Sequence, residues 1–181
     1  MTLPTKKLSL TINDKAIDPV DVPEGMMMQD FLHEYLNLTG SRLGCGQGIC
    51  HACTVVVEKD DGTLDEVRTC ITGAHWFEGK KVRTVEGHAK RDASGAIAEL
   101  SPVQQAFIEN FAFQCGYCTP GFVTGATVFM DQLKRKPVAR ADLEQAITDA
   151  LDKHICRCTG YVRYHQAVRD LVLKTPGLVK A

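Results

Sequence analysis

The sequence has no long apolar run, no excess of charge and no visible export signal. Its apolar stretches, such as residues 54–57, are far shorter than the roughly 20 residues of a membrane-spanning helix, so we expect a soluble chain. The 21 basic and 22 acidic residues balance, which gives no electrostatic reason to expect nucleic acid or a membrane surface as a partner. The opening MTLPTKKLSLTIN contains neither an apolar signal region nor a twin-arginine pair. The sequence predicts a cytoplasmic protein, or a periplasmic one exported together with a signal-bearing partner.

Motifs for chemistry on a substrate are also missing. No paired carboxylates, nucleophile–base pair or phosphate-binding loop stands out in the sequence. The stretch GCGQG at residues 44–48 is not a dinucleotide fingerprint, because a strand and not a helix is expected after it. We therefore predict no catalytic residue on this chain. Its 181 residues, 44% of them hydrophobic and 24% charged, fit one ordinary domain or two small ones.

Cysteine is the residue type that the sequence has in excess. Eight cysteines fall into two sets of four with a long cysteine-free segment between them: Cys45, Cys50, Cys53 and Cys70, then Cys115, Cys118, Cys156 and Cys158. Four thiolates are the ligand set of a tetrahedral zinc ion or of an iron–sulfur cluster. Because no export signal is visible, bound metal is favoured over disulfides.

The first set has the spacing of a plant-type ferredoxin. Its order is C-x4-C-x2-C followed, after sixteen intervening residues, by Cys70, which predicts a [2Fe–2S] cluster. The glycines among these cysteines suit a loop that must turn tightly around a cluster. His51 interrupts the motif, but a Rieske-type centre replaces two cysteines by two histidines, and here all four thiols are present. We expect His51 at the surface of the loop and not among the ligands.

Residues 1–85 have the pattern of a small strand-rich domain. KLSLTIN alternates in polarity, Asn13-Asp14 is a turn signal, and a short second strand is expected at residues 15–18. Apolar residues at helical spacing from Met28 to Leu36 predict a helix before the cysteine loop, and residues 54–58 and 81–86 predict further strands. These elements fit the β-grasp arrangement of a plant-type ferredoxin.

The remainder of the chain has a helical pattern after a linker at residues 86–100. Ser101-Pro102 and Thr119-Pro120 are helix start signals, with Phe107, Ile108, Phe111 and Ala112 expected on one face of the first helix. Two more helices are expected at residues 141–151 and 164–172. Residues 101–181 are therefore predicted to form a four-helix bundle, which makes the fold class α+β.

The second set of cysteines lies at the junctions of these helices. C-x2-C stands between the first and second helices and C-x-C between the third and fourth, so the two loops can meet around one metal site. Spacing alone leaves zinc open here, although C-x-C is unusual for zinc and the first set favours iron and sulfide.

Three stretches together resemble a known family. GCGQGICHAC, FQCGYCTPG and ICRCTGY are similar to the two-cluster iron–sulfur subunit of the molybdenum hydroxylases, which include xanthine dehydrogenase, aldehyde oxidoreductase and isoquinoline oxidoreductase. The resemblance covers residues 5–173. It implies a ferredoxin-like domain, a helical domain and two [2Fe–2S] clusters held by the eight cysteines. The chain differs at His51, where relatives usually carry glycine, and in a longer segment before Cys70.

The resemblance also implies partners and a direction of electron flow. A large subunit would hold a molybdenum–pterin cofactor, with Gln114 and Cys158 of this chain beside the pterin. Electrons would pass to the cluster of the second cysteine set, then to that of the first, and then to a flavin or c-type cytochrome subunit. The substrate would be an aldehyde, a purine or an N-heterocycle.

Other interpretations of the sequence stay open. The chain could be a free-standing two-cluster electron carrier, or a zinc-stapled interaction module without a redox role. The alternative for Gln114 is a polar residue at a helix end without a partner.

Overall fold

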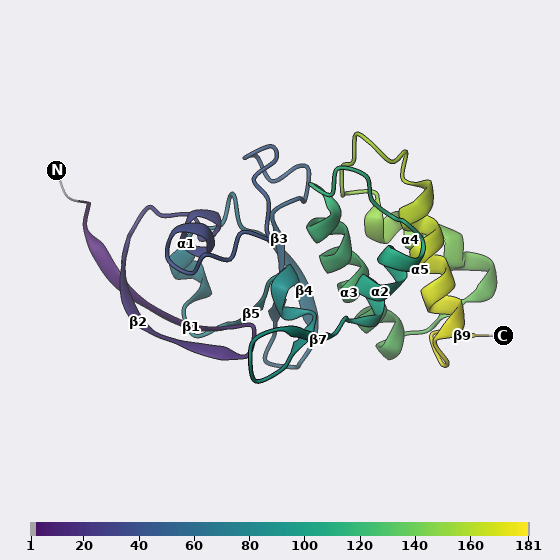
Figure 1. The fold of residues 1–181 in the computed structure, drawn as a ribbon, viewed down its shortest axis with the longest axis horizontal. Coiled ribbons are helices and arrows are strands. Elements are labelled where there is room, and N and C mark those ends of the chain that lie inside the picture. Colours follow the sequence, from purple (N-terminus) through teal and green to yellow (C-terminus); the bar gives the residue numbers. More distant parts are fainter. Residues whose placement is uncertain (1–2, 181) are drawn as a thin grey trace.

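A strand-rich half lies beside a helical half in the computed structural model, which describes residues 3–180 (Figure 1). The first half contains one five-stranded sheet in the order β2-β1-β5-β3-β4. Its strands are β1 (Thr5–Ile12), β2 (Lys15–Pro23), β3 (Thr54–Glu58), β4 (Leu64–Arg68) and β5 (Lys81–Arg83). β1 and β5 are parallel, and every other neighbouring pair in this sheet is antiparallel. With the helix described below, this is the predicted β-grasp arrangement.

The β1–β2 hairpin follows from the local sequence. Leu8, Leu10 and Ile12 alternate along β1 and all three are buried. Asn13 and Asp14 adopt φ values of 51° and 64°, the left-handed conformation that a tight two-residue hairpin turn requires. β2 extends to Pro23, well beyond the predicted residues 15–18.

One helix covers the sheet. α1 (Met28–Glu34) buries Met28, Phe31 and Leu32 against the β-strands. It ends before Tyr35 and Leu36, which the apolar spacing had placed in it. The sheet also contains β4, which was not predicted because its LDEVR segment mixes charged and apolar residues. The strand predicted at residues 81–86 ends at Arg83 and a 3₁₀ turn follows.

Four helices surround the core of the second half: α2 (Pro102–Glu109), α3 (Thr119–Arg135), α4 (Leu143–Leu151) and α5 (Val162–Lys174). The predicted start of α2 is confirmed by a capping box. The Ser101 hydroxyl accepts from the Gln104 N–H at 3.2 Å, and the Gln104 side chain accepts from the Ser101 N–H at 3.0 Å. The prediction for the far end of α2 is wrong. Phe111 lies beyond the helix in a left-handed conformation and is 75% exposed, because the chain turns away toward the cysteine loop.

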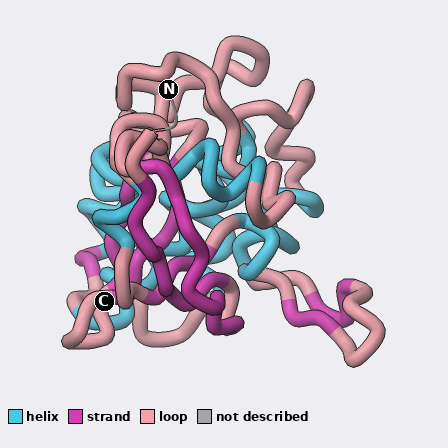
Figure 2. Tube along the Cα trace, turned by 90° about the vertical axis from the view of Figure 1, so that its left-hand side faces the viewer, coloured by secondary structure: helices cyan, strands magenta, loops and turns pink. Residues whose placement is uncertain are grey.

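The connection between the halves contains an exposed hairpin. β6 (Lys90–Arg91) pairs with β7 (Ile97–Glu99), and Figure 2 shows this small hairpin standing out from the rest of the molecule. The short strands β8 (Val138–Ala139) and β9 (Val179–Lys180) pair on the helical half.

Helix α3 packs against β3 and β4 and joins the two halves. Val55 and Val57 of β3 face the core under α1, so the buried Val56 between them faces the other way. Glu66 is the cross-strand partner of Val56 and therefore shares its face. The Arg135 guanidinium at the end of α3 donates to the Gly62 carbonyl at 2.7 Å. No helix in the described part of the chain is long and apolar enough to cross a membrane.

Candidate metal centres

The loop at residues 44–53 directs backbone N–H groups at a cysteine sulfur. The Gln47, Ile49 and Cys50 N–H groups lie 3.3, 3.4 and 3.5 Å from Cys45 Sγ. Burial alone would raise the pKa of the Cys45 thiol, but these N–H groups lower it to about 6. The loop therefore stabilises a thiolate, which is the form that binds metal.

Glycines allow this loop to close on its sulfurs. Gly46 and Gly48 have φ values of 68° and 70°, which side chains rarely tolerate. A methyl group at Gly44 would meet Cys50 Sγ at 2.9 Å. The prediction that these glycines serve a tight cysteine loop agrees with this geometry.

The other two cysteines of the first set face each other. Burial raises the pKa of the Cys53 thiol to about 11, and the neighbouring Cys70 thiol adds to the increase. Two thiolates at this position need a cation to offset their burial and repulsion. A metal centre fits this donor set.

The second set lies where two loops meet. Cys158 Sγ is 3.6 Å from Cys115 Sγ, and both residues are exposed. Burial raises the pKa of Cys118 to about 11, with the Cys156 thiol adding to the increase. The second set thus joins the loop between α2 and α3 to the loop between α4 and α5.

Hydroxyl groups contact two sulfurs of the second set. The Thr159 hydroxyl donates to Cys156 Sγ at 3.1 Å. The Tyr164 hydroxyl lies 3.4 Å from Cys118 Sγ and 3.1 Å from the Thr119 hydroxyl. Thr119 and Thr159, which follow the two cysteine pairs, therefore contact the site and its supporting Tyr164. None of the eight cysteines forms a disulfide.

The two cysteine loops touch at one edge of the molecule, uppermost in Figure 1. The Ile155 N–H, one residue before Cys156, donates to the Cys50 carbonyl at 3.1 Å. Nearby, the Tyr117 hydroxyl donates to the Leu43 carbonyl at 2.8 Å. The Ile155–Cys50 hydrogen bond therefore joins a candidate ligand of the first set, Cys50, to the residue that precedes Cys156 of the second set.

His51 is not at the surface, so that expectation is wrong. It is 8% exposed and adopts a φ of 57°. The loop lies against α3 at Gly121, where a methyl group would overlap the His51 carbonyl. One turn further along α3, a methyl at Gly125 would overlap the ring of His154, which is 1% exposed. The Gly-x3-Gly spacing was the sequence signal for this close approach.

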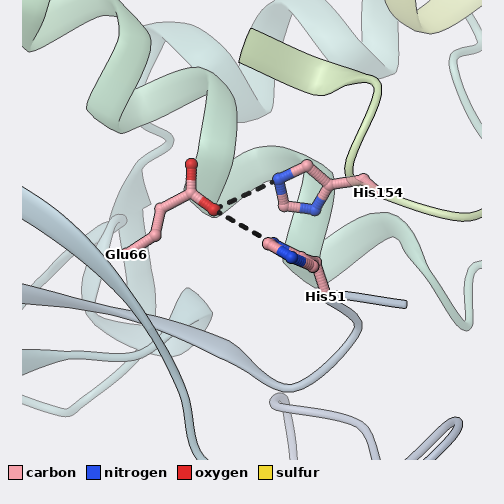
Figure 3. Close-up of side chains that lie close together, drawn as sticks. All are labelled: His51, Glu66 and His154. Atoms are coloured by element: carbon pink, nitrogen blue, oxygen red, sulfur yellow. Dashed lines mark ion pairs between the residues drawn. The ribbon is translucent and has the colours of Figure 1, made fainter. Parts of the chain in front are cut away.

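His51 and His154 meet at a carboxylate that no sequence motif indicates. Glu66 Oε2 lies 3.6 Å from His51 Nδ1 and 3.3 Å from His154 Nε2 (Figure 3). The imidazole rings are edge to face, with centroids 5.0 Å apart. Burial alone would raise the pKa of Glu66, but His154 and His51 lower it to about 2. No local motif links these residues, because they come from three separate segments.

Replacing His51 by glycine is expected to leave both metal centres assembled, because none of the eight thiols is altered and glycine accepts the left-handed backbone without strain. At most, the potential or exposure of the first cluster should change. Iron content and the visible spectrum of the His51→Gly protein measure this. Loss of the first cluster would identify His51 as a ligand.

Comparisons with known proteins match both halves. Residues 10–75 match the family described as "2Fe-2S iron-sulfur cluster binding domain", and residues 84–169 match "[2Fe-2S] binding domain". These two matches support two [2Fe–2S] clusters on this chain, one for each half.

Curated proteins match over most of their length. The chain is 38% identical to the nicotine 6-hydroxylase small subunit of Paenarthrobacter nicotinovorans, over 84% of this chain and 79% of that one. It is 36% identical to the xanthine dehydrogenase iron-sulfur-binding subunit of Escherichia coli O157:H7, over 92% and 94% of the two chains.

Solved structures also match over most of the chain. Quinoline 2-oxidoreductase from Pseudomonas putida 86 matches with a TM-score of 0.76 and 30% identity, over 96% of this chain and 93% of that one. Aldehyde oxidoreductase from Desulfovibrio desulfuricans ATCC 27774 matches with a TM-score of 0.74 and 34% identity, over 92% of this chain but 17% of that one.

Proposed function

The chain belongs to the two-cluster iron–sulfur subunits of the molybdenum hydroxylases, and we propose that it carries electrons away from a molybdenum–pterin cofactor held by a separate large subunit. The observation that carries this proposal is the pair of four-cysteine sites whose loops meet at the Ile155–Cys50 hydrogen bond. A [2Fe–2S] cluster at each site supplies a one-electron carrier. Two adjacent carriers in a small protein suit a relay between partners.

We assign the ligands by the two cysteine sets. Cys45, Cys50, Cys53 and Cys70 hold one cluster, and Cys115, Cys118, Cys156 and Cys158 hold the other. In this proposal residues 1–85 are the ferredoxin-like domain, residues 86–100 the linker and residues 101–181 the helical domain. The separate hydrophobic cores of the two halves support this division.

Electrons enter at the second set in this proposal. Gln114 and Cys158 are both exposed and would contact the pterin, where the Gln114 amide can form hydrogen bonds. Phe113, which precedes Gln114, and the nearby Phe111 are also exposed, as expected of a surface that a partner covers. The buried Cys53 belongs to the other cluster, which would pass electrons to a flavin or c-type cytochrome subunit.

The large subunit supplies the substrate chemistry in this proposal, because the sequence of this chain offers no catalytic group. The relatives named for nicotine, xanthine, caffeine, nicotinate and aldehydes support an aldehyde, a purine or another N-heterocycle as the substrate class.

Co-purification and metal analysis test the proposal together. A tagged chain should retain a larger molybdenum-containing chain through gel filtration, and should contain about four irons and four acid-labile sulfides of its own. Both clusters without a molybdenum partner would favour the free-standing carrier. Zinc with sulfur ligands in place of iron would contradict the relay.

A further inference from the structure

Two buried histidines and a half-buried glutamate converge where the two halves touch. His51 comes from the first cysteine loop, Glu66 from β4, and His154 from the segment between α4 and the second cysteine loop. One ligand atom from each lies within 4.8 Å of the other two. Figure 3 shows both imidazoles turned toward the same carboxylate oxygen. The group therefore bridges the sheet, the helical bundle and both cysteine loops.

These polar atoms are buried without hydrogen bonds. His51 Nδ1, Glu66 Oε2 and both ring nitrogens of His154 have no hydrogen-bond partner among the described residues. A buried polar group without a hydrogen-bond partner destabilises the fold, because it has lost water and gained nothing in exchange. Because one such atom from each of the three residues lies close to the other two, a single bound ligand could contact all three.

The distances from Glu66 Oε2 to the two imidazole nitrogens fit a shared metal ion. Zinc binds imidazole nitrogen and carboxylate oxygen at about 2.0–2.2 Å, and ligands at the corners of a tetrahedron then lie about 3.3–3.6 Å apart. The two distances to Glu66 Oε2 are 3.3 and 3.6 Å. Charge-assisted hydrogen bonds would be shorter, at about 2.7–2.9 Å. Two histidines and a carboxylate are also a known ligand set for zinc.

We propose that His51, Glu66 and His154 form a third metal site, separate from the eight cysteines, which binds a divalent cation of the zinc class. The ion is coordinated by His51 Nδ1, Glu66 Oε2 and His154 Nε2, and water takes the fourth position from the side where the Glu66 side chain is 22% exposed. Because the ligands come from both halves, the ion fastens the halves together beside the loop contact. The site is structural and independent of the proposed electron relay.

Zinc content is the direct test. The purified protein with both clusters assembled is incubated with Zn²⁺, desalted and analysed for zinc, iron and sulfide. We expect about one retained zinc per chain in addition to the iron of the clusters. Zinc X-ray absorption should show nitrogen and oxygen neighbours at about 2.0–2.2 Å and no sulfur shell at about 2.3 Å. Absence of retained zinc, or a shell made of sulfur, overturns the proposal even if no variant folds.

Matched variants locate the site. Glu66→Gln and His154→Asn should lose the retained zinc while keeping the iron and sulfide content. The controls are Asp65→Asn, whose exposed carboxylate pairs with Lys59 at 3.1 Å, and His165→Asn on α5; both should retain the zinc. Zinc should raise the thermal unfolding midpoint of the unmodified protein and of the controls only. Equal zinc retention in Glu66→Gln and His154→Asn would contradict the assignment.

Discussion

An assembled enzyme that carries Cys50→Ala in this subunit is expected to take electrons from substrate but to stop turning over with its external acceptor. The substitution removes one thiol of the first set, so the first cluster is lost. The Cys50 backbone carbonyl, which accepts the Ile155 N–H at 3.1 Å, remains in the variant, so the contact between the loops is kept. Substrate should therefore still reduce the second cluster.

Cys158→Ala gives the opposite result in the proposed order. The exposed Cys158 belongs to the second set, 3.6 Å from Cys115, and its loss removes the cluster nearer the pterin. Substrate should then fail to reduce even the intact first cluster at a useful rate. The helical domain should also lose the folding free energy that its cluster supplies.

Rapid-mixing spectra of both variants separate these outcomes. Each cluster is followed after substrate is added, and turnover with the external acceptor is measured in parallel. Iron analysis must first show that each variant lacks one cluster only. If Cys158→Ala reduces its first cluster as fast as the unmodified enzyme does, the proposed order is wrong.

Features encoded by neighbouring residues could be predicted from the sequence. The alternation of Leu8, Leu10 and Ile12 gave β1, and Ser101-Pro102 gave the start of α2, because each depends on a few adjacent residues. The spacing of Cys45, Cys50 and Cys53 predicted their loop for the same reason. The grouping of Cys115 with Cys158, 43 residues apart, was proposed from helix junctions and the family resemblance, and the structure brings their sulfurs together.

Features that depend on tertiary packing could not be predicted in this way. His51 is buried because its loop packs closely against Gly121 of α3, which comes seventy residues later in the sequence. The loop sequence alone therefore suggested an exposed residue. Glu66 lies on β4, which was not predicted as a strand because its residues mix charged and apolar types. The Glu66 side chain is largely covered because α3 packs on that face of the sheet. The apolar spacing continues through Phe111, so the predicted helix extended past the true end of α2. Apolar periodicity alone does not show where the chain turns toward the cysteine loop.

Replacing Phe122 by alanine should destabilise the helical half more than the strand-rich half. Phe122 is 1% exposed, and its ring stacks on Tyr164 with centroids 4.0 Å apart and an interplanar angle of 4°. Its ring centroid is also 5.1 Å from that of His154. A buried Phe→Ala substitution costs about 3–5 kcal/mol, because apolar contacts are lost and a cavity remains. The gap would open beneath both loops of the second cysteine set.

The second cluster is therefore expected to be lost from the Phe122→Ala protein at a lower temperature than the first. Tyr164 holds its hydroxyl 3.4 Å from Cys118 Sγ, so a tilted ring would withdraw support from that sulfur. Phe111→Ala is the matched control: Phe111 is 75% exposed, so the isolated subunit should change by less than about 0.5 kcal/mol. Visible absorption and iron release during thermal unfolding follow the clusters. If Phe122→Ala loses both clusters together at the unmodified midpoint, the stacked pair does not support the second site, and the rigidity of the two cysteine loops must come from their backbone hydrogen bonds alone.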